Sequence, residues 1–275
     1  MNHERLNNHE RHRRPRLRAL PVNSLIPNML TVISLCAGLT SIRFSLNERW
    51  ELAVLAIVFA GIMDGLDGRL ARLLKGVTRF GAELDSLADF LSFGAAPAVV
   101  IYTWSSHELG SIGWTCSLFL AVCTALRLAR FNTALEDPDK PAFAYNYFVG
   151  VPSPAGGILA LLPMMISFEW TDGPFREAPL TSIWMVVIGL LMVSKFPTFA
   201  FKKVKVPHAY VLPTLVGAGL FAAALFSAPW LTLIAVGIAY LALFPLSYRS
   251  FHRPTAEARR IAGEAPADGA PPPAT

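Results

Sequence analysis

Eight apolar runs, each about 17–25 residues long and so matched to the hydrocarbon thickness of a bilayer, constrain this chain more than any other feature. They cover residues 27–44, 51–73, 82–104, 112–133, 154–170, 180–196, 209–227 and 229–247. Inside a bilayer, only helices and closed barrels satisfy all their backbone hydrogen bonds, and runs of this length are helical. Hydrophobic residues make up 53% of the 275 residues, which is too apolar for a typical soluble domain. We therefore expect an all-α, polytopic integral membrane helical bundle of about eight transmembrane helices.

The positive charges predict the orientation of that bundle. If the N-terminus lies inside, 21 of the 24 Lys and Arg residues fall on inside segments, and the outside loops keep only Arg43, Arg49 and Arg176. Because inside loops carry the excess of Lys and Arg, both termini are expected to be cytoplasmic. The same count puts the connection between the second and third runs at the cytoplasmic surface.

Polar tails flank the predicted transmembrane domain, residues 19–250. Residues 1–18 carry six arginines and are expected to form a disordered basic tail that contacts anionic membrane lipid. Residues 251–275 are rich in Ala and Pro and are also expected to be disordered. The net charge of +5 does not indicate nucleic-acid binding, because the charges lie between apolar runs.

Four aspartates interrupt the second and third runs. Asp64 and Asp67 are spaced i, i+3, and Asp85 and Asp89 are spaced i, i+4, so each pair shares one helical face. Carboxylates at membrane depth are costly and usually mark a functional site. Oxygen ligands without nearby Cys or His favour a hard cation such as Mg²⁺ or Mn²⁺. The alternative is a set of intramembrane salt bridges with arginines.

Small and basic residues between the aspartates fit a phosphorylated ligand. Gly68 and Gly81 would let such a ligand approach the backbone closely. Arg72 carries a guanidinium group suited to phosphate, and Thr78 in the short connection could add a hydroxyl contact. Carboxylates, a metal and an arginine together could hold a diphosphate.

This pattern resembles the signature of the CDP-alcohol phosphatidyltransferase family. The matching residues read Asp64-x2-Asp67-Gly68-x2-Ala71-Arg72-x8-Gly81-x3-Asp85-x3-Asp89. The resemblance implies that Asp64, Asp67 and Asp85 bind metal, with Asp89 as general base and further ligand. It implies that Gly68, Arg72 and Thr78 contact the CDP-linked lipid, and that the protein is a homodimer.

Two further segments bear on the substrates. Asn28 and Thr31 lie at the start of the first run; they either cap its helix or, as the family resemblance implies, border the nucleotide pocket. Arg127 and Arg130 end the fourth run, where they either anchor the helix at the cytoplasmic surface or hold a lipid phosphate or a substrate carboxylate.

The segments Leu126–Asn132 (LRLARFN) and Phe148–Ala155 (FVGVPSPA) resemble the phosphatidylserine synthase branch of the family. Val151 stands where that branch usually has leucine, and Gly156 and Gly157 stand for small alanines. The resemblance implies CDP-diacylglycerol and L-serine as substrates, and phosphatidylserine and CMP as products. A bacterial inner membrane is the expected location, with the active site facing the cytoplasm as the distribution of Lys and Arg predicts. Alternatives are another alcohol (glycerol 3-phosphate, inositol or inositol phosphate), a divalent-cation transporter, or a structural scaffold.

Overall fold

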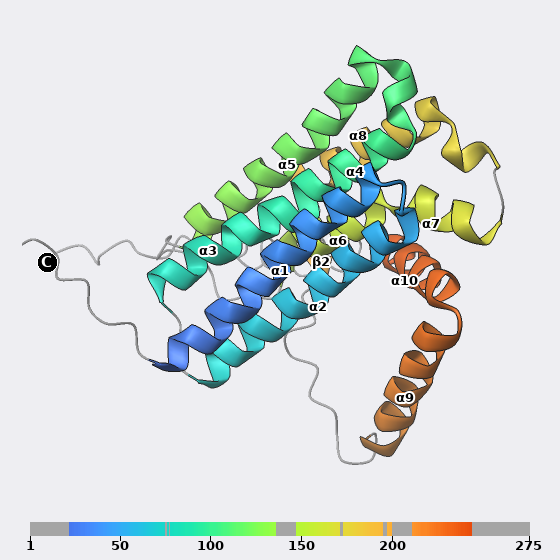
Figure 1. Ribbon diagram of the computed structural model, residues 1–275. Coiled ribbons are helices and arrows are strands. Elements are labelled where there is room, and N and C mark those ends of the chain that lie inside the picture. Colours follow the sequence, from blue (N-terminus) through green and yellow to red (C-terminus); the bar gives the residue numbers. More distant parts are fainter. Residues whose placement is uncertain are drawn as a thin grey trace, which may run out of the picture.

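The computed structural model is mostly helical (Figure 1). It describes residues 22–74, 76, 78–135, 147–170, 173–194, 197–199 and 211–243. The first half holds α1 (Val22–Leu46), α2 (Trp50–Leu73), α3 (Arg79–Phe90), η1 (Leu91–Ala95), α4 (Ala96–Trp104), η2 (Ser106–Leu109) and α5 (Ser111–Leu135). The second half holds β1 (Tyr147–Val149), α6 (Ser153–Ala160), α7 (Leu162–Glu169), η4 (Pro174–Arg176), α8 (Ala178–Val193), β2 (Pro197–Phe199), α9 (Val211–Ser227) and α10 (Pro229–Ala242). The predicted tails, 1–18 and 251–275, lie outside the described residues.

The predicted runs coincide with these helices, with three local differences. The helix α1 already includes Val22, so it extends five residues before the predicted start at Pro27. The fifth run is divided at Leu161 into α6 and α7, next to Pro163, whose ring disfavours a continuous helix. The strands β1 and β2 pair antiparallel, an element that the apolar pattern did not predict.

Three of the described helical stretches are long and apolar enough to cross a membrane. They are Leu25–Leu46, Arg79–Trp104 and Ser111–Thr133, and Ala178–Val193, Leu212–Ser227 and Pro229–Ala242 are shorter apolar helices. The polytopic helical bundle is thus confirmed in its main outline. Eight crossings and the placement of both termini in the cytoplasm stay predictions.

Buried hydroxyl groups tie α1 to its neighbours. Ser34 donates to the carbonyl of Ala60 (3.0 Å) and Ser41 donates to that of Ala53 (2.8 Å), both on α2. On the other side, Ser92 of η1 donates to the carbonyl of Ser34 (3.1 Å). Hydroxyl bonds of this kind are typical of helices that meet inside a bilayer, where apolar burial cannot drive their association. They fix α1 against both α2 and the α3–η1 helix.

A π-helical turn, η1, begins two residues after Asp89 and brings the third run close to α6. A Cβ atom added to Gly157 of α6 would lie 2.8 Å from the Cα atom of Phe93, so only glycine permits this approach. Phe93 is fully buried in the core. Single π turns are frequent at functional sites. Here the turn and the glycine set the position of the helix that carries Asp85 and Asp89.

The helix α9 stands apart from the bundle. It extends away from the other helices in Figure 1, with α10 as its main neighbour. Nearly all of its described side chains are exposed, including Leu212, Leu220 and Phe226. An apolar surface of this size is typical of a helix that faces lipid or a partner.

Candidate metal and nucleotide site

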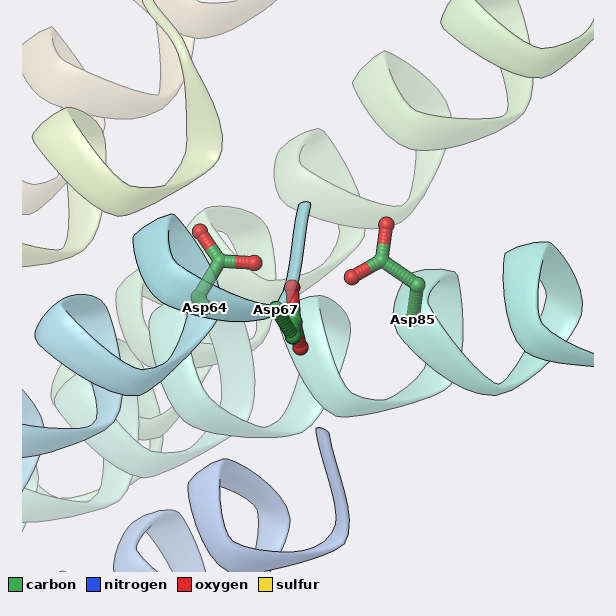
Figure 2. Close-up of side chains that lie close together, drawn as sticks. All are labelled: Asp64, Asp67 and Asp85. Carbon is green, nitrogen blue, oxygen red and sulfur yellow. The ribbon is translucent and has the colours of Figure 1, made fainter. Parts of the chain in front are cut away.

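Three carboxylates from two helices converge at one point. Asp64 and Asp67 on α2 and Asp85 on α3 each offer an oxygen, and these oxygens lie within 4.8 Å of one another. Figure 2 shows Asp64 and Asp85 directed toward each other with Asp67 between them. Separate salt bridges to arginines would not require such convergence. Three carboxylate oxygens this close together could hold one shared cation.

Asp67 is the buried member of the cluster, and α1 holds it in place. Thr31 donates its hydroxyl proton to an oxygen of Asp67 at 2.6 Å, and the two side chains are both only 4% exposed. Because α1 continues through both Asn28 and Thr31, neither residue caps its start, and that alternative was wrong. Thr31 instead orients a carboxylate of the cluster, as partners behind a metal ligand commonly do.

Asp89 lies next to the cluster, one helical turn beyond Asp85. Its carboxyl group is within hydrogen-bonding reach of that of Asp64. The guanidinium group of Arg127 on α5 lies within electrostatic range of both carboxylates. A cation at this position offsets part of the negative charge that four neighbouring aspartates create.

Arg127 is deeply buried for a charged residue, with only 7% of its surface exposed. Its Nη1 donates to the hydroxyl of Ser153 at the start of α6, and its side chain packs over the ring of Phe131. Its Nε is buried without a hydrogen-bond partner. Leaving such a donor unpaired costs about 1–3 kcal/mol, and a bound ligand would remove this cost.

A cavity of about 390 Å³ opens beside the cluster, between α1, α2 and α3. Most of the predicted substrate-binding residues line it together with two of the aspartates: Asn28, Thr31, Asp67, Gly68, Arg72, Thr78, Gly81 and Asp85. Its volume is within the range of small-molecule pockets. Residues far apart in the sequence thus meet at one cavity that ends on the carboxylates.

The two predicted glycines, Gly68 and Gly81, differ in what surrounds them in this cavity. A Cβ atom added to Gly68 would have no atom within 4 Å, so the backbone there is open to a ligand. A Cβ atom added to Gly81 would lie 2.7 Å from Oδ1 of Asn28, so Gly81 lets α3 approach α1. Thr78 also has a structural task, since its hydroxyl oxygen accepts the backbone N–H of Gly81 (3.0 Å) and caps α3.

The two predicted arginines outside the cluster are placed differently. Arg72 is exposed at the cavity, and its Nε donates to the carbonyl of Gly68 on its own helix (2.8 Å). Arg130 donates to the carbonyls of Val193 (2.8 Å) and Ser194 (3.3 Å) at the end of α8. Cations are favourable at a helix C-terminus, so Arg130 has a role in packing whether or not it also contacts substrate.

Sequence reasoning did not single out Ser153 and Phe131. Ser153 is the first residue of α6, and only the fold brings it to Arg127. Phe131 follows Arg127 by four residues and lines the cavity, so helical spacing could have indicated it.

The residues fit a hard divalent cation. The three convergent groups are carboxylates, the ligand type that Mg²⁺ and Mn²⁺ prefer, and one of them is held by a buried hydroxyl. Like charges this close repel one another unless a cation or protons intervene. A divalent ion would relieve that repulsion and add a positive charge at the end of the cavity.

Comparisons with known proteins agree with this geometry. The model of the family described as CDP-alcohol phosphatidyltransferase matches residues 24–194, and that described as CDP-alcohol phosphatidyltransferase 2 matches residues 209–245. The CDP-diacylglycerol–serine O-phosphatidyltransferase of Mycobacterium leprae is 38% identical over 234 residues, which cover 85% of this chain and 78% of the relative. The protein of the same name from Helicobacter pylori is 36% identical over 190 residues (68% and 77%). That from Bacillus subtilis is 34% identical over 178 residues (65% and 92%).

Proposed function

Since this chain belongs to the CDP-alcohol phosphatidyltransferase family, we propose that it transfers the phosphatidyl group of CDP-diacylglycerol to L-serine, giving phosphatidylserine and CMP. The convergence of Asp64, Asp67 and Asp85 at the end of a cavity is the observation that carries this proposal. The names of the relatives support serine as the acceptor.

Asp64, Asp67 and Asp85 would hold the Mg²⁺ or Mn²⁺ ion, with Asp89 close enough to serve as a further ligand. A bound divalent ion would neutralise diphosphate charge and favour departure of CMP. Thr31 keeps the Asp67 carboxylate turned toward the ion site. These contacts position the phosphorus that reacts.

The cavity between α1, α2 and α3 would receive the cytidine diphosphate part of the donor. Gly68 leaves backbone exposed for close approach. Arg72 is exposed at the cavity, and while its Nε donates to Gly68, its two terminal NH2 groups can donate to a phosphate oxygen. Asn28 supplies an amide that can bond to the nucleotide. The residues that line this cavity are thus suited to a nucleotide rather than to a bare ion alone.

Asp89 is the proposed general base. It would take the proton from the serine hydroxyl, the serine oxygen would form a bond to the phosphorus that carries diacylglycerol, and the bond from that phosphorus to the CMP oxygen would break. A general base typically contributes about 10²–10⁴-fold to the rate. Asp89→Asn should therefore abolish measurable turnover and retain CDP-lipid binding, as measured by calorimetry; unchanged turnover would exclude this role.

Arg127 is the proposed partner of the serine carboxylate. It is buried beside Asp89, its Nε has no hydrogen-bond partner, and Ser153 steadies its Nη1. A carboxylate on the acceptor would complete these bonds while the acceptor hydroxyl faces Asp89. A phosphorylated acceptor would call for more cations, and Arg130 already binds carbonyls of α8.

The cytoplasmic side of a bacterial inner membrane is the proposed location. The apolar helices and the family make this an integral membrane protein. The distribution of Lys and Arg favours a cytoplasmic opening of the site, where a nucleotide product can leave into water. The homodimer implied by the family resemblance stays a prediction.

A panel of acceptors tests the proposal. Purified protein is given CDP-diacylglycerol, Mg²⁺ or Mn²⁺, and in turn L-serine, glycerol 3-phosphate, inositol or inositol phosphate. CMP release that depends on serine alone is the expected result. CMP release with another alcohol would identify that alcohol as the acceptor in place of serine. Metal uptake into vesicles without any CMP release would favour a transporter.

A further inference from the structure

The C-terminal end of α8 is bound by an arginine of α5. Arg130 donates from Nη1 to the carbonyl of Val193 (2.8 Å) and from Nη2 to the carbonyl of Ser194 (3.3 Å). The last turn of a helix leaves its carbonyl groups without partners inside the helix, and in a bilayer the protein itself has to supply those partners. Arg130 supplies them here and thereby joins α5 to α8.

The loop that leads into α6 is attached to the same end of α8. A Cβ atom added to Gly150 would lie 2.4 Å from the carbonyl oxygen of Met192 and 3.0 Å from that of Ser194. The backbone N–H of Val151 donates to the carbonyl of Leu191 (3.4 Å), and β1 and β2, which flank this contact, pair with each other. Gly150 has φ +81°, a conformation that favours glycine. Glycine thus permits both the turn and the close approach of the loop to α8.

These contacts close a ring that includes Arg127. The added Cβ atom at Gly150 would also lie 3.2 Å from Nη2 of Arg130, so the loop and Arg130 are neighbours at α8. Three residues after Gly150, the fully buried Ser153 accepts a hydrogen bond from Nη1 of Arg127. Arg127 and Arg130 are three residues apart on α5 and share a helical face. We call this ring, made of Arg127, Arg130, Gly150, Ser153 and the end of α8, the α8 junction.

We propose that Arg130 and Gly150 are positioning residues for the acceptor: through the α8 junction they hold the guanidinium group of Arg127 in place, and they do not contact substrate themselves. This inference rests on the proposed function, because it takes Arg127 as the partner of the serine carboxylate. A long side chain holds a ligand well only if a second set of contacts locks its conformation. Ser153 provides such a contact as long as its loop stays on α8.

The bonds of Arg130 itself favour positioning over direct binding. Both of its terminal nitrogens already donate to carbonyls of α8. Turning this group toward a substrate would leave those carbonyls without their partner at the helix end, at a cost that a bilayer makes larger. Arg127, whose buried Nε has no hydrogen-bond partner, can bind a carboxylate without giving up its bond to Ser153.

Substitution of either positioning residue should weaken serine binding and spare the lipid donor. Arg130→Met removes both bonds to α8, and Gly150→Ala pushes the loop away from the carbonyl of Met192. A misplacement of about 1 Å can cost about a hundredfold, so a partial displacement of Arg127 should raise the KM for serine about tenfold. The KM for CDP-diacylglycerol should stay near its wild-type value. Arg130→Lys keeps the charge without the two-pronged geometry and should give an intermediate KM for serine.

Gly150→Ala separates positioning from direct binding, because it leaves the guanidinium group of Arg130 in the protein. A KM for serine that rises in Arg130→Met but not in Gly150→Ala would overturn the proposal, as would wild-type values in both. In the Arg127→Met background neither substitution should raise this KM further, because no guanidinium group remains to be positioned; effects that multiply there would also overturn it. Gly219→Ala on α9, where an added Cβ meets no atom within 4 Å, and Arg43→Met are the controls.

Thermal unfolding in detergent shows which variants fold. If Gly150→Ala does not, Ser153→Ala takes its place, since it removes only the hydroxyl that holds Arg127. It should reproduce the rise in the KM for serine, and Arg130→Lys should add nothing in the Ser153→Ala background. A further rise in that background would contradict a path through Ser153.

A crystal structure of Gly150→Ala or Arg130→Met without substrate tests the α8 junction independently of turnover. We expect the bond between Nη1 of Arg127 and the hydroxyl of Ser153 to be lost, while the carboxylates of α2 and α3 keep their arrangement. An unchanged bond would overturn the proposal. Absence of serine-dependent CMP release from the wild-type protein would instead count against the proposed function, and the crystal structure would then decide the role of the junction by itself.

Discussion

The helices around the aspartates and the helix α9 differ in what holds them. The first group, α1 to α3, is joined by buried hydroxyl bonds such as Ser34 to Ala60 and Thr31 to Asp67. Along α9, side chains are exposed and added Cβ atoms at Gly217 and Gly219 would meet nothing. Specific polar bonds fix positions to fractions of an ångström, which catalysis needs. An apolar face only has to match lipid or another apolar surface.

Substitutions in the carboxylate cluster are expected to lower activity the most. Asp64→Asn, Asp67→Asn and Asp85→Asn each remove a charged ligand, so CMP release should fall by more than about a thousandfold, corresponding to several kcal/mol of transition-state stabilisation. Glu51→Gln, which changes an exposed carboxylate in the first turn of α2, is the matched control. Any cluster variant within tenfold of wild type would contradict the assigned metal site.

A smaller effect is expected at Arg127. Loss of a hydrogen bond to a charged group costs about 1.5–3 kcal/mol, so Arg127→Met should raise the KM for serine about 10- to 100-fold. The KM for CDP-diacylglycerol should stay near its wild-type value, and discrimination between serine and ethanolamine should weaken. Arg43→Met, an exposed arginine near the end of α1, serves as the control. Equal rises in both KM values would indicate a role in packing instead.

Loss of the Thr31 hydroxyl, which bonds to Asp67, is expected to have the next smaller effect on activity. Thr31→Val keeps the shape of the side chain and removes the 2.6 Å bond, so metal affinity should weaken by about 10- to 100-fold. At saturating Mn²⁺, turnover should recover to within a few-fold of wild type. Thr40→Val on the same helix removes only a bond to the carbonyl of Cys36 and should leave metal affinity unchanged. Equal metal titrations for the two variants would argue against the orienting role.

The smallest effect is expected on α9. Gly217→Leu should change kcat/KM for either substrate by less than about twofold, because surface changes remote from packed contacts cost little. Thermal unfolding in detergent, followed by tryptophan fluorescence, checks that the fold is retained. A loss as large as that of a cluster variant would mean that α9 helps to form the site and that the contrast between the two regions is false.

Local patterns in the sequence predicted which helices carry the aspartates and that the two members of each pair lie on the same helical face. Asp64 with Asp67 and Asp85 with Asp89 share helical faces because helical periodicity fixes that relation without any tertiary contact. The lengths of the apolar runs likewise predicted most helix positions to within a few residues. The family resemblance supplied candidate substrate-binding residues, and the structure brings most of them to the cavity between α1, α2 and α3.

Contacts across the fold could not be predicted in the same way. The bond from Thr31 to Asp67 and the approach of Gly81 to Asn28 join helices whose relative rotation no local pattern sets. The pairing of β1 with β2 joins two three-residue strands about fifty residues apart, too short to give an alternating pattern. Arg130 was expected either to anchor its helix or to hold substrate, and its bond to the carbonyl of Val193 depends on where α8 ends.

Anomalous diffraction from crystals grown with Mn²⁺ and CDP-diacylglycerol tests the central claim most directly. The account predicts a manganese peak bounded by the carboxylates of Asp64, Asp67 and Asp85, with the diphosphate beside it. The peak should disappear in Asp85→Asn crystals. A manganese peak elsewhere, or a diphosphate bound away from these three side chains, would contradict the account.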